Sequence, residues 1–134
     1  MADVGFYLIQ SQIRQLDLAC RICRKSIQTS QQPLLVKFDD INALQQFDAL
    51  LWQFDASSFI AHDVDDLNSP ICLSLTLPEQ FDGDCLNLGQ ELVDPQRFLR
   101  VLEIIENTEA AKVTGRERFK AYRALGIEPV THQV

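Results

Sequence analysis

Hydrophobic and polar positions follow one another in blocks along the chain, and these blocks predict alternating strands and helices. Short apolar runs rich in aromatic and β-branched residues predict strands. The predicted strands are residues 4–9, 33–38, 58–62, 70–77, 85–89 and 100–105. Apolar residues that recur every three or four positions predict amphipathic helices. The predicted helices are residues 11–28, 41–52 and 108–125.

Capping residues mark several of the predicted helix ends. Asp39 or Asp40 can cap the second helix, because a short polar side chain accepts hydrogen bonds from a first turn. Asp94 followed by Pro95 predicts a short helix up to residue 99, since proline is well tolerated at the first helical position. Gly126 is expected to end the last helix, because glycine readily adopts the left-handed backbone conformation.

The alternation of apolar strands with helices predicts the α/β fold class. We expect a Rossmann-like three-layer sandwich with a largely parallel sheet and helices on both faces. The length of 134 residues suits one domain over residues 1–134. Nucleotide-dependent enzymes share this fold class, but the chain carries neither G-x-G-x-x-G nor G-x-x-x-x-G-K-[ST], and we expect no cofactor. A degenerate nucleotide-dependent enzyme of the Rossmann type is the alternative.

Charge is distributed unevenly in this acidic chain, whose formal net charge is −7. Residues 110–123 hold five of the 12 Lys and Arg residues and one of the 19 Asp and Glu residues, a net charge of +4. The rest of the chain therefore carries −11. Duplex DNA needs a broad basic surface, so we expect little direct binding to nucleic acid. A local cationic pocket in an acidic body suits a short acidic ligand such as a peptide tail.

The last predicted helix concentrates cations on one side. Five of its residues fall within about 100° of the circumference at about 100° per residue. These residues are Lys112, Arg116, Phe119, Lys120 and Arg123, and we call them the cationic stripe. Val113, Tyr122 and Leu125 fall on the other side, which we expect to be buried. The stripe is either a solvated helix face or a docking surface in which cations bind carboxylates beside an apolar anchor.

Four cysteines and the absence of export signals indicate a cytoplasmic protein with free thiols. The N-terminal residues lack a basic segment followed by a long apolar one, and no apolar run is long enough to span a membrane. Cys20 and Cys23 fall on the apolar side of a predicted helix, and Cys72 lies in a predicted strand. We therefore expect buried structural thiols rather than a zinc site.

Residues with catalytic or metal-binding chemistry are sparse. His132 lies in a tail that we expect to fray. His62 precedes Asp63, Asp65 and Asp66, so a metal or base site and an acidic surface loop are alternatives, of which the loop is favoured. No serine or cysteine stands in a nucleophile-elbow context, and we expect no catalytic and no metal residues.

Aromatic residues cluster around the end of the second predicted helix. Trp52 is the only tryptophan, and Phe54 and Phe59 follow it closely. These three side chains either belong to the core or form a partner-binding patch, since aromatic residues anchor protein interfaces at low entropic cost.

Three segments resemble one known protein family. They are "GFYLI" at residues 5–9, "LLWQFDASSFIAHDV" at residues 50–64 and "GRERFKAYRALGI" at residues 115–127. All three resemble the chi subunit of the bacterial DNA polymerase III holoenzyme, in order and at compatible spacing. The resemblance implies a replisome-associated accessory subunit with no catalysis of its own and a Rossmann-like fold without a nucleotide.

The resemblance also implies two partners. One is the psi subunit, which tethers chi to the clamp loader, and a damage-response helicase can pair in its place. The other is the acidic C-terminal tail of single-stranded DNA-binding protein, so that chi links the replicase to coated lagging-strand template. An unrelated scaffold that binds acidic peptides is a further alternative.

Matching positions carry the roles of the family's residues onto this chain. The tail site would comprise Lys112, Arg116, Phe119, Ile105, Lys120 and Arg123, with Arg116 facing the terminal carboxylate. The psi site would comprise Trp52, Phe59, Ala61 and His62. Ala61 stands where the family carries proline, and Phe119 stands where tyrosine is common.

Overall fold

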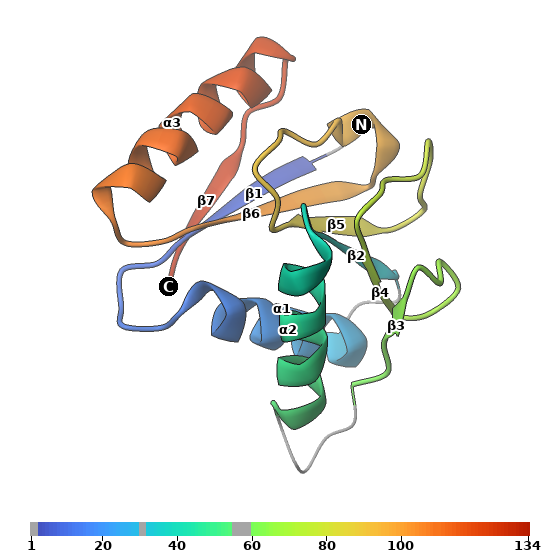
Figure 1. Ribbon diagram of the computed structural model, residues 1–134. Helices are drawn as coiled ribbons and strands as arrows, with labels where there is room; N and C mark the ends of the chain where they lie inside the picture. Colours follow the sequence, from blue (N-terminus) through green and yellow to red (C-terminus); the bar gives the residue numbers. More distant parts are fainter. Residues whose placement is uncertain (1–2, 30–31, 55–59) are drawn as a thin grey trace.

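A computed structural model describes residues 3–29, 32–54 and 60–134 of the chain, which fold around a seven-stranded sheet (Figure 1). The strands are β1 (Asp3–Leu8), β2 (Leu34–Lys37), β3 (Asp63–Val64), β4 (Ile71–Ser74), β5 (Asp84–Asn87), β6 (Arg100–Ile105) and β7 (Val130–Gln133). Their order across the sheet is β3-β4-β2-β5-β6-β1-β7, and every neighbouring pair is parallel. The helices are α1 (Gln15–Thr29), α2 (Ile41–Gln53) and α3 (Glu109–Ala124), with a 3-10 turn η1 (Pro95–Arg97).

Helices cover both faces of the sheet and make a three-layer sandwich. Figure 1 shows α1 and α2 together on one side of the sheet and α3 on the other. Successive strand residues point to opposite faces. Leu34 accordingly belongs to the cluster that contains Phe47 of α2, whereas Leu35 belongs to the cluster that contains Tyr122 of α3. The predicted α/β class with a parallel sheet and helices on both faces is confirmed.

Helix ends follow the expected capping chemistry. Asp40, not Asp39, caps α2, since its side chain accepts a hydrogen bond of 2.8 Å from the Ala43 N–H. Asp94 accepts one from the Gln96 N–H at the start of η1. Gly126 follows α3 with a φ of +86°, the left-handed conformation expected of it.

Two predictions about the strands are wrong. No strand covers residues 60–62, the described part of the strand predicted at 58–62, and β3 instead begins at Asp63. The His62 side chain is buried there, and its Nδ1 forms a hydrogen bond with the Ile60 carbonyl oxygen. At the C-terminus, residues expected to fray form β7, and His132 stacks on Tyr7 with ring centroids 5.1 Å apart. All four β7 residues are exposed, so this strand has no apolar pattern from which it could be predicted.

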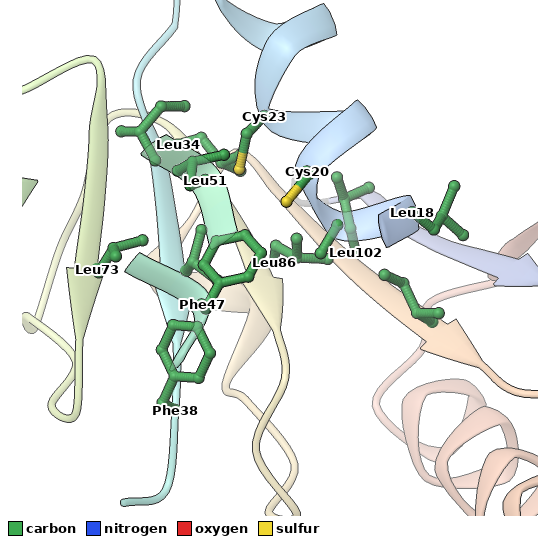
Figure 2. Close-up of a cluster of buried hydrophobic side chains, with 14 of the residues drawn as sticks. Leu18, Cys20, Cys23, Leu34, Phe38, Phe47, Leu51, Leu73, Leu86 and Leu102 are labelled. Carbon is green, nitrogen blue, oxygen red and sulfur yellow. The ribbon is translucent and has the colours of Figure 1, made fainter. Parts of the chain in front are cut away.

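Cysteine thiols form part of the core, as predicted. Figure 2 shows the sulfur atoms of Cys20 and Cys23 directed into a cluster that includes Phe47 and Leu86. The unpaired and buried cysteines are Cys20, Cys23, Cys72 and Cys85. Burial raises the pKa of the Cys20 thiol to about 12 and that of Cys72 to about 11. The thiols therefore stay protonated and unreactive at neutral pH.

Candidate functional site

A cavity of about 390 Å³ opens between α3 and the carboxyl ends of β1 and β6. The chain leaves β1 toward α1 on one face of the sheet and leaves β6 toward α3 on the other face. The cavity therefore lies where the connections diverge, which is the usual ligand site of an open parallel sheet. Its position follows from the topology and does not depend on any sequence motif.

The floor of the cavity is apolar. Phe6 of β1, Ile105 of β6 and Phe119 of α3 line it, and the Phe6 and Phe119 rings lie 5.5 Å apart. Gly115 brings α3 close to the sheet, because a Cβ there would lie 2.9 Å from the Cδ1 of Ile105. The cavity can therefore bury an apolar or aromatic group of a ligand.

Cations stand at the mouth of this apolar floor. Lys112 and Arg116 line the cavity, and Glu106 is the one acidic residue among its lining residues. Lys112 lies 3.9 Å from a carboxylate oxygen of the exposed Glu109, a loose contact. Within the described residues Arg116 forms no ion pair, so its guanidinium is available for a ligand carboxylate. Arginine binds carboxylates with two parallel hydrogen bonds.

Four of the six residues predicted for the tail site meet at this cavity. They are Ile105, Lys112, Arg116 and Phe119. Lys120 and Arg123 do not line it but follow on the exposed surface of α3. Arg123 lies 3.3 Å from Glu128, while Lys120 has no ion pair within the described residues.

The buried side of α3 differs from the one that the sequence pattern predicted. Val113 and Leu125, expected to be buried, are 49% and 56% exposed. Tyr122 is buried as expected, but the buried side of the helix continues to Gly115 rather than to Val113 and Leu125, and Phe119 is partly buried. Because Phe119 packs against the buried cluster and also belongs to the cationic stripe, the stripe borders the buried side of α3 and opens onto the cavity.

A buried polar network holds α3 in this orientation. Glu103 of β6 is completely buried and accepts hydrogen bonds from three side chains. These come from Arg118, from the Tyr122 hydroxyl at 2.7 Å and from the Asn87 amide at 3.0 Å. Arg118 also donates to the carbonyl of Gly89 at 2.8 Å, which ties α3 to the loop after β5. Arg118 therefore has a structural role: it fixes α3 to the sheet and is not available to a ligand.

The network was missed by the sequence analysis, although two signals were available. Glu103 is the only acidic residue in the apolar strand β6. Arg118 falls at about 240° when Lys112 is set at 0°, away from the cationic stripe. Burial raises the pKa of Glu103, and Arg118 is the strongest influence that lowers it again. Burial, with the Glu103 charge beside it, also raises the pKa of Tyr122.

A second surface lies at the end of α2. Trp52 is 52% exposed, so it is not a core residue, and Phe54 next to it is partly buried. The indole lies against the buried ring of His62, with centroids 4.3 Å apart. His62 in turn contacts Asp48 of α2 through Nε2, at 2.7 Å. An exposed indole supported by a buried ring is a suitable anchor for a protein partner.

The residues predicted for the psi site are only partly described. Trp52 and His62 are in contact, and Ala61 beside them is half-buried. Phe59 lies outside the described residues. This Trp52 surface and the α3 cavity belong to helices on opposite faces of the sheet, so two partners could bind without contacting each other.

The described part of the chain contains neither a cluster of metal-binding side chains nor a helix that could span a membrane. No three His, Cys, Asp or Glu side chains gather there to hold a metal ion. His62 pairs with Asp48 rather than with Asp63, Asp65 or Asp66, which are exposed, as expected for an acidic surface loop. None of the described helices is long and apolar enough to cross a membrane.

Sequence comparison assigns the chain to a family. Residues 1–130 match the family described as "DNA polymerase III chi subunit, HolC". A Pseudomonas aeruginosa protein named DNA polymerase III subunit chi is 30% identical over 140 aligned positions, which cover 100% of this chain and 98% of the relative. A Haemophilus influenzae protein of the same name is 26% identical, with 88% and 86% covered. The chain therefore belongs to the DNA polymerase III chi subunit family, the non-catalytic accessory subunits of that polymerase.

Proposed function

We propose that this subunit binds the acidic C-terminal tail of single-stranded DNA-binding protein in the α3 cavity and the psi subunit at the Trp52 surface. It would thereby connect the polymerase holoenzyme to coated single-stranded template. The observation that carries the proposal is the cavity itself, in which an apolar floor lies directly beneath Lys112 and Arg116. The damage-response helicase would compete with psi for the same surface.

The cavity suits a peptide that is acidic and ends in an apolar side chain. The terminal side chain would fill the floor between Ile105 and Phe119, while the terminal carboxylate would bind Arg116. Lys120 and Arg123, further along α3, would meet acidic residues upstream in the tail. Charge-assisted hydrogen bonds of this kind contribute about 1.5–3 kcal/mol each.

The Trp52 surface suits psi because it offers a large, exposed aromatic side chain that packs against the buried ring of His62. Interfaces depend on a few such residues, whose truncation commonly costs about 2 kcal/mol or more. Trp52 projects from α2, which packs on the opposite face of the sheet from α3. Pairing with psi should therefore leave the α3 cavity open to the tail.

Titration with a fluorescently labelled tail peptide tests the first site. Arg116→Ala should weaken binding by about tenfold or more, which corresponds to the loss of one charge-assisted hydrogen bond. Arg21→Ala is the matched control, because Arg21 is an exposed arginine on α1 at the other face. Equal affinities of folded Arg116→Ala and wild-type protein would refute the site. A peptide with scrambled acidic sequence separates this function from a general scaffold for acidic peptides.

Pairing with psi tests the second site. Trp52→Ala should lose psi while keeping tail affinity within about twofold, because distant sites contribute independently. Phe59→Ala should do the same if Phe59 shares the surface. Circular dichroism establishes that each variant is folded. Normal psi pairing by Trp52→Ala, or loss of both partners together, would contradict the assignment.

A further inference from the structure

The strand β7 forms one edge of the sheet, and its outer side is open. It pairs with β1 on one side, and within the described residues no strand pairs with the other side. Val134 directs both of its backbone groups inward, since its N–H donates to the Leu8 carbonyl and its carbonyl accepts from the Gln10 N–H. Backbone groups of successive strand residues face opposite neighbours. The N–H and carbonyl groups of Thr131 and Gln133 therefore face outward.

The edge lacks the features that usually protect such strands from pairing. Edge strands of soluble proteins are commonly shielded by charged side chains, by proline or by a covering segment. The β7 sequence VTHQ contains no Lys, Arg, Asp, Glu or Pro, and its four residues are all exposed. The open edge can therefore accept one more strand, which is a common mode of peptide recognition.

The cationic stripe of α3 lies on the same side of the molecule as this edge. Arg118 faces the loop after β5, and the middle of the stripe lies about 150° round the helix from it. Because the sheet order is β5-β6-β1-β7, the stripe faces β7, which Figure 1 shows at the rim of the sheet beside α3. Two contacts agree with this placement. Thr131 lines the cavity together with Arg116, and Arg123 lies 3.3 Å from Glu128, two residues before β7.

We propose that the acidic tail pairs with the open edge of β7 and adds an eighth, parallel strand to the seven-stranded sheet. This inference rests on the proposed tail site. There the end of the tail lies in the cavity at the carboxyl ends of the strands, while upstream acidic residues lie beside Lys120 and Arg123, toward the amino ends. The tail then runs in the direction of β7. One tail residue donates its N–H to the Thr131 carbonyl and accepts a hydrogen bond from the Gln133 N–H.

Replacing Gln133 by proline tests the protein side of this pairing. Proline has no N–H and is tolerated in an edge strand where that N–H faces solvent. Gln133→Ala is the matched control, because it removes the same side chain and keeps the N–H. Gln133→Pro should bind a labelled tail peptide about fivefold more weakly than Gln133→Ala, the effect of one lost hydrogen bond. Equal affinities of the two variants, both shown to be folded by circular dichroism, would overturn the inference.

Tail peptides methylated at one backbone nitrogen at a time test the other side with the unaltered protein. Methylation of the nitrogen that faces Thr131 should weaken binding about fivefold, whereas methylation of either neighbouring nitrogen should have an effect within about twofold. Saturating peptide should slow hydrogen exchange of the Gln133 amide by about fivefold or more, while the His132 amide, which faces β1, is protected with and without peptide. Equal binding of all methylated peptides, or unchanged exchange at Gln133, would overturn the pairing.

Two further results separate the pairing from related explanations. If Arg116→Ala binds the tail as tightly as the wild type, the tail site is wrong and the pairing falls with it. If Arg116→Ala binds weakly but Gln133→Pro and the methylated peptides bind normally, only the pairing is wrong. Analytical ultracentrifugation of the free protein covers a second copy as the occupant of this edge. A dimer that Gln133→Pro dissociates without any change in tail affinity would overturn the inference.

Discussion

Replacing Arg118 by methionine should destabilise the fold far more than the same change at Arg116, two residues away. The Arg118 side chain is only 12% exposed and pairs with Glu103, which is completely buried. Arg118 also donates to the carbonyls of Gly89 and Gln90. Methionine has a similar length but no donor, so Arg118→Met leaves the carboxylate without its cation.

The magnitude follows from what remains around Glu103. Removing one partner of a buried ion pair costs about 3–5 kcal/mol. The Tyr122 hydroxyl and the Asn87 amide still donate to the carboxylate, so we expect a cost near the lower end, about 3 kcal/mol. A domain of this size has about 5–15 kcal/mol of stability, so the variant stays folded. Its melting temperature should fall by roughly 10 °C.

The cost of Arg118→Met should depend on pH. Burial raises the pKa of Glu103 above its ordinary value, and Arg118 opposes that rise. A raised folded-state pKa means that the folded protein favours the protonated carboxyl, so the associated stability is present at low pH and lost as the pH rises through that pKa. Without Arg118 the pKa of Glu103 rises further. The destabilisation should therefore be larger at about pH 8 than at about pH 5.

Urea unfolding of the wild type, Arg118→Met and Arg116→Met at both pH values measures this effect. Arg116→Met is the matched control, because it removes an exposed arginine and should change stability by no more than about 0.5 kcal/mol. The reasoning is refuted if the two variants unfold within about 0.5 kcal/mol of each other at the higher pH. Tail binding should rank them in the opposite order, with Arg116→Met the weaker binder.

Three other predictions follow from single features of the structure. All four cysteines should resist a thiol reagent near pH 8 in the native protein and react after unfolding, since burial raises the pKa of Cys72 to about 11; rapid native labelling would contradict this. Gly126→Ala should lower the free energy of unfolding in urea by about 1 kcal/mol, because alanine is strained at a φ of +86°. An unchanged urea midpoint would contradict this prediction. Added salt should weaken tail binding gradually, because it screens Lys112 and Arg116 but not the apolar floor; salt-independent binding would refute the role of these cations.

Strands buried on both faces were predictable from the sequence, because burial leaves a continuous apolar run. Residues 71–74 are all buried, and the pattern around them predicted a strand. The opposite holds for β7, in which Val130 and its neighbours are exposed. That strand forms because its backbone pairs with β1, from the other end of the chain. No local pattern of side chains encodes such pairing.

The candidate site was predictable in composition but not in orientation. Helical spacing grouped Lys112, Arg116 and Phe119 correctly, and these residues meet at the cavity. Spacing could not reveal which side of α3 faces the sheet, because that depends on partners elsewhere in the chain. Glu103 and the close approach at Gly115 determine it.

The same partners decide how much of the basic segment can reach a ligand. Residues 110–123 carry a net charge of +4, but Arg118 is neutralised by Glu103 and Arg123 lies beside Glu128. Among the residues that the structure describes, Arg116 and Lys120 form no ion pair and Lys112 makes only the loose contact with Glu109, so the available positive charge is small within a chain of net charge −7. An extended polyanion needs a broad basic surface and would be repelled by the rest of the molecule. A short acidic peptide with an apolar end would meet the few cations and the apolar floor together, so we expect the proposed site to prefer such a peptide to nucleic acid.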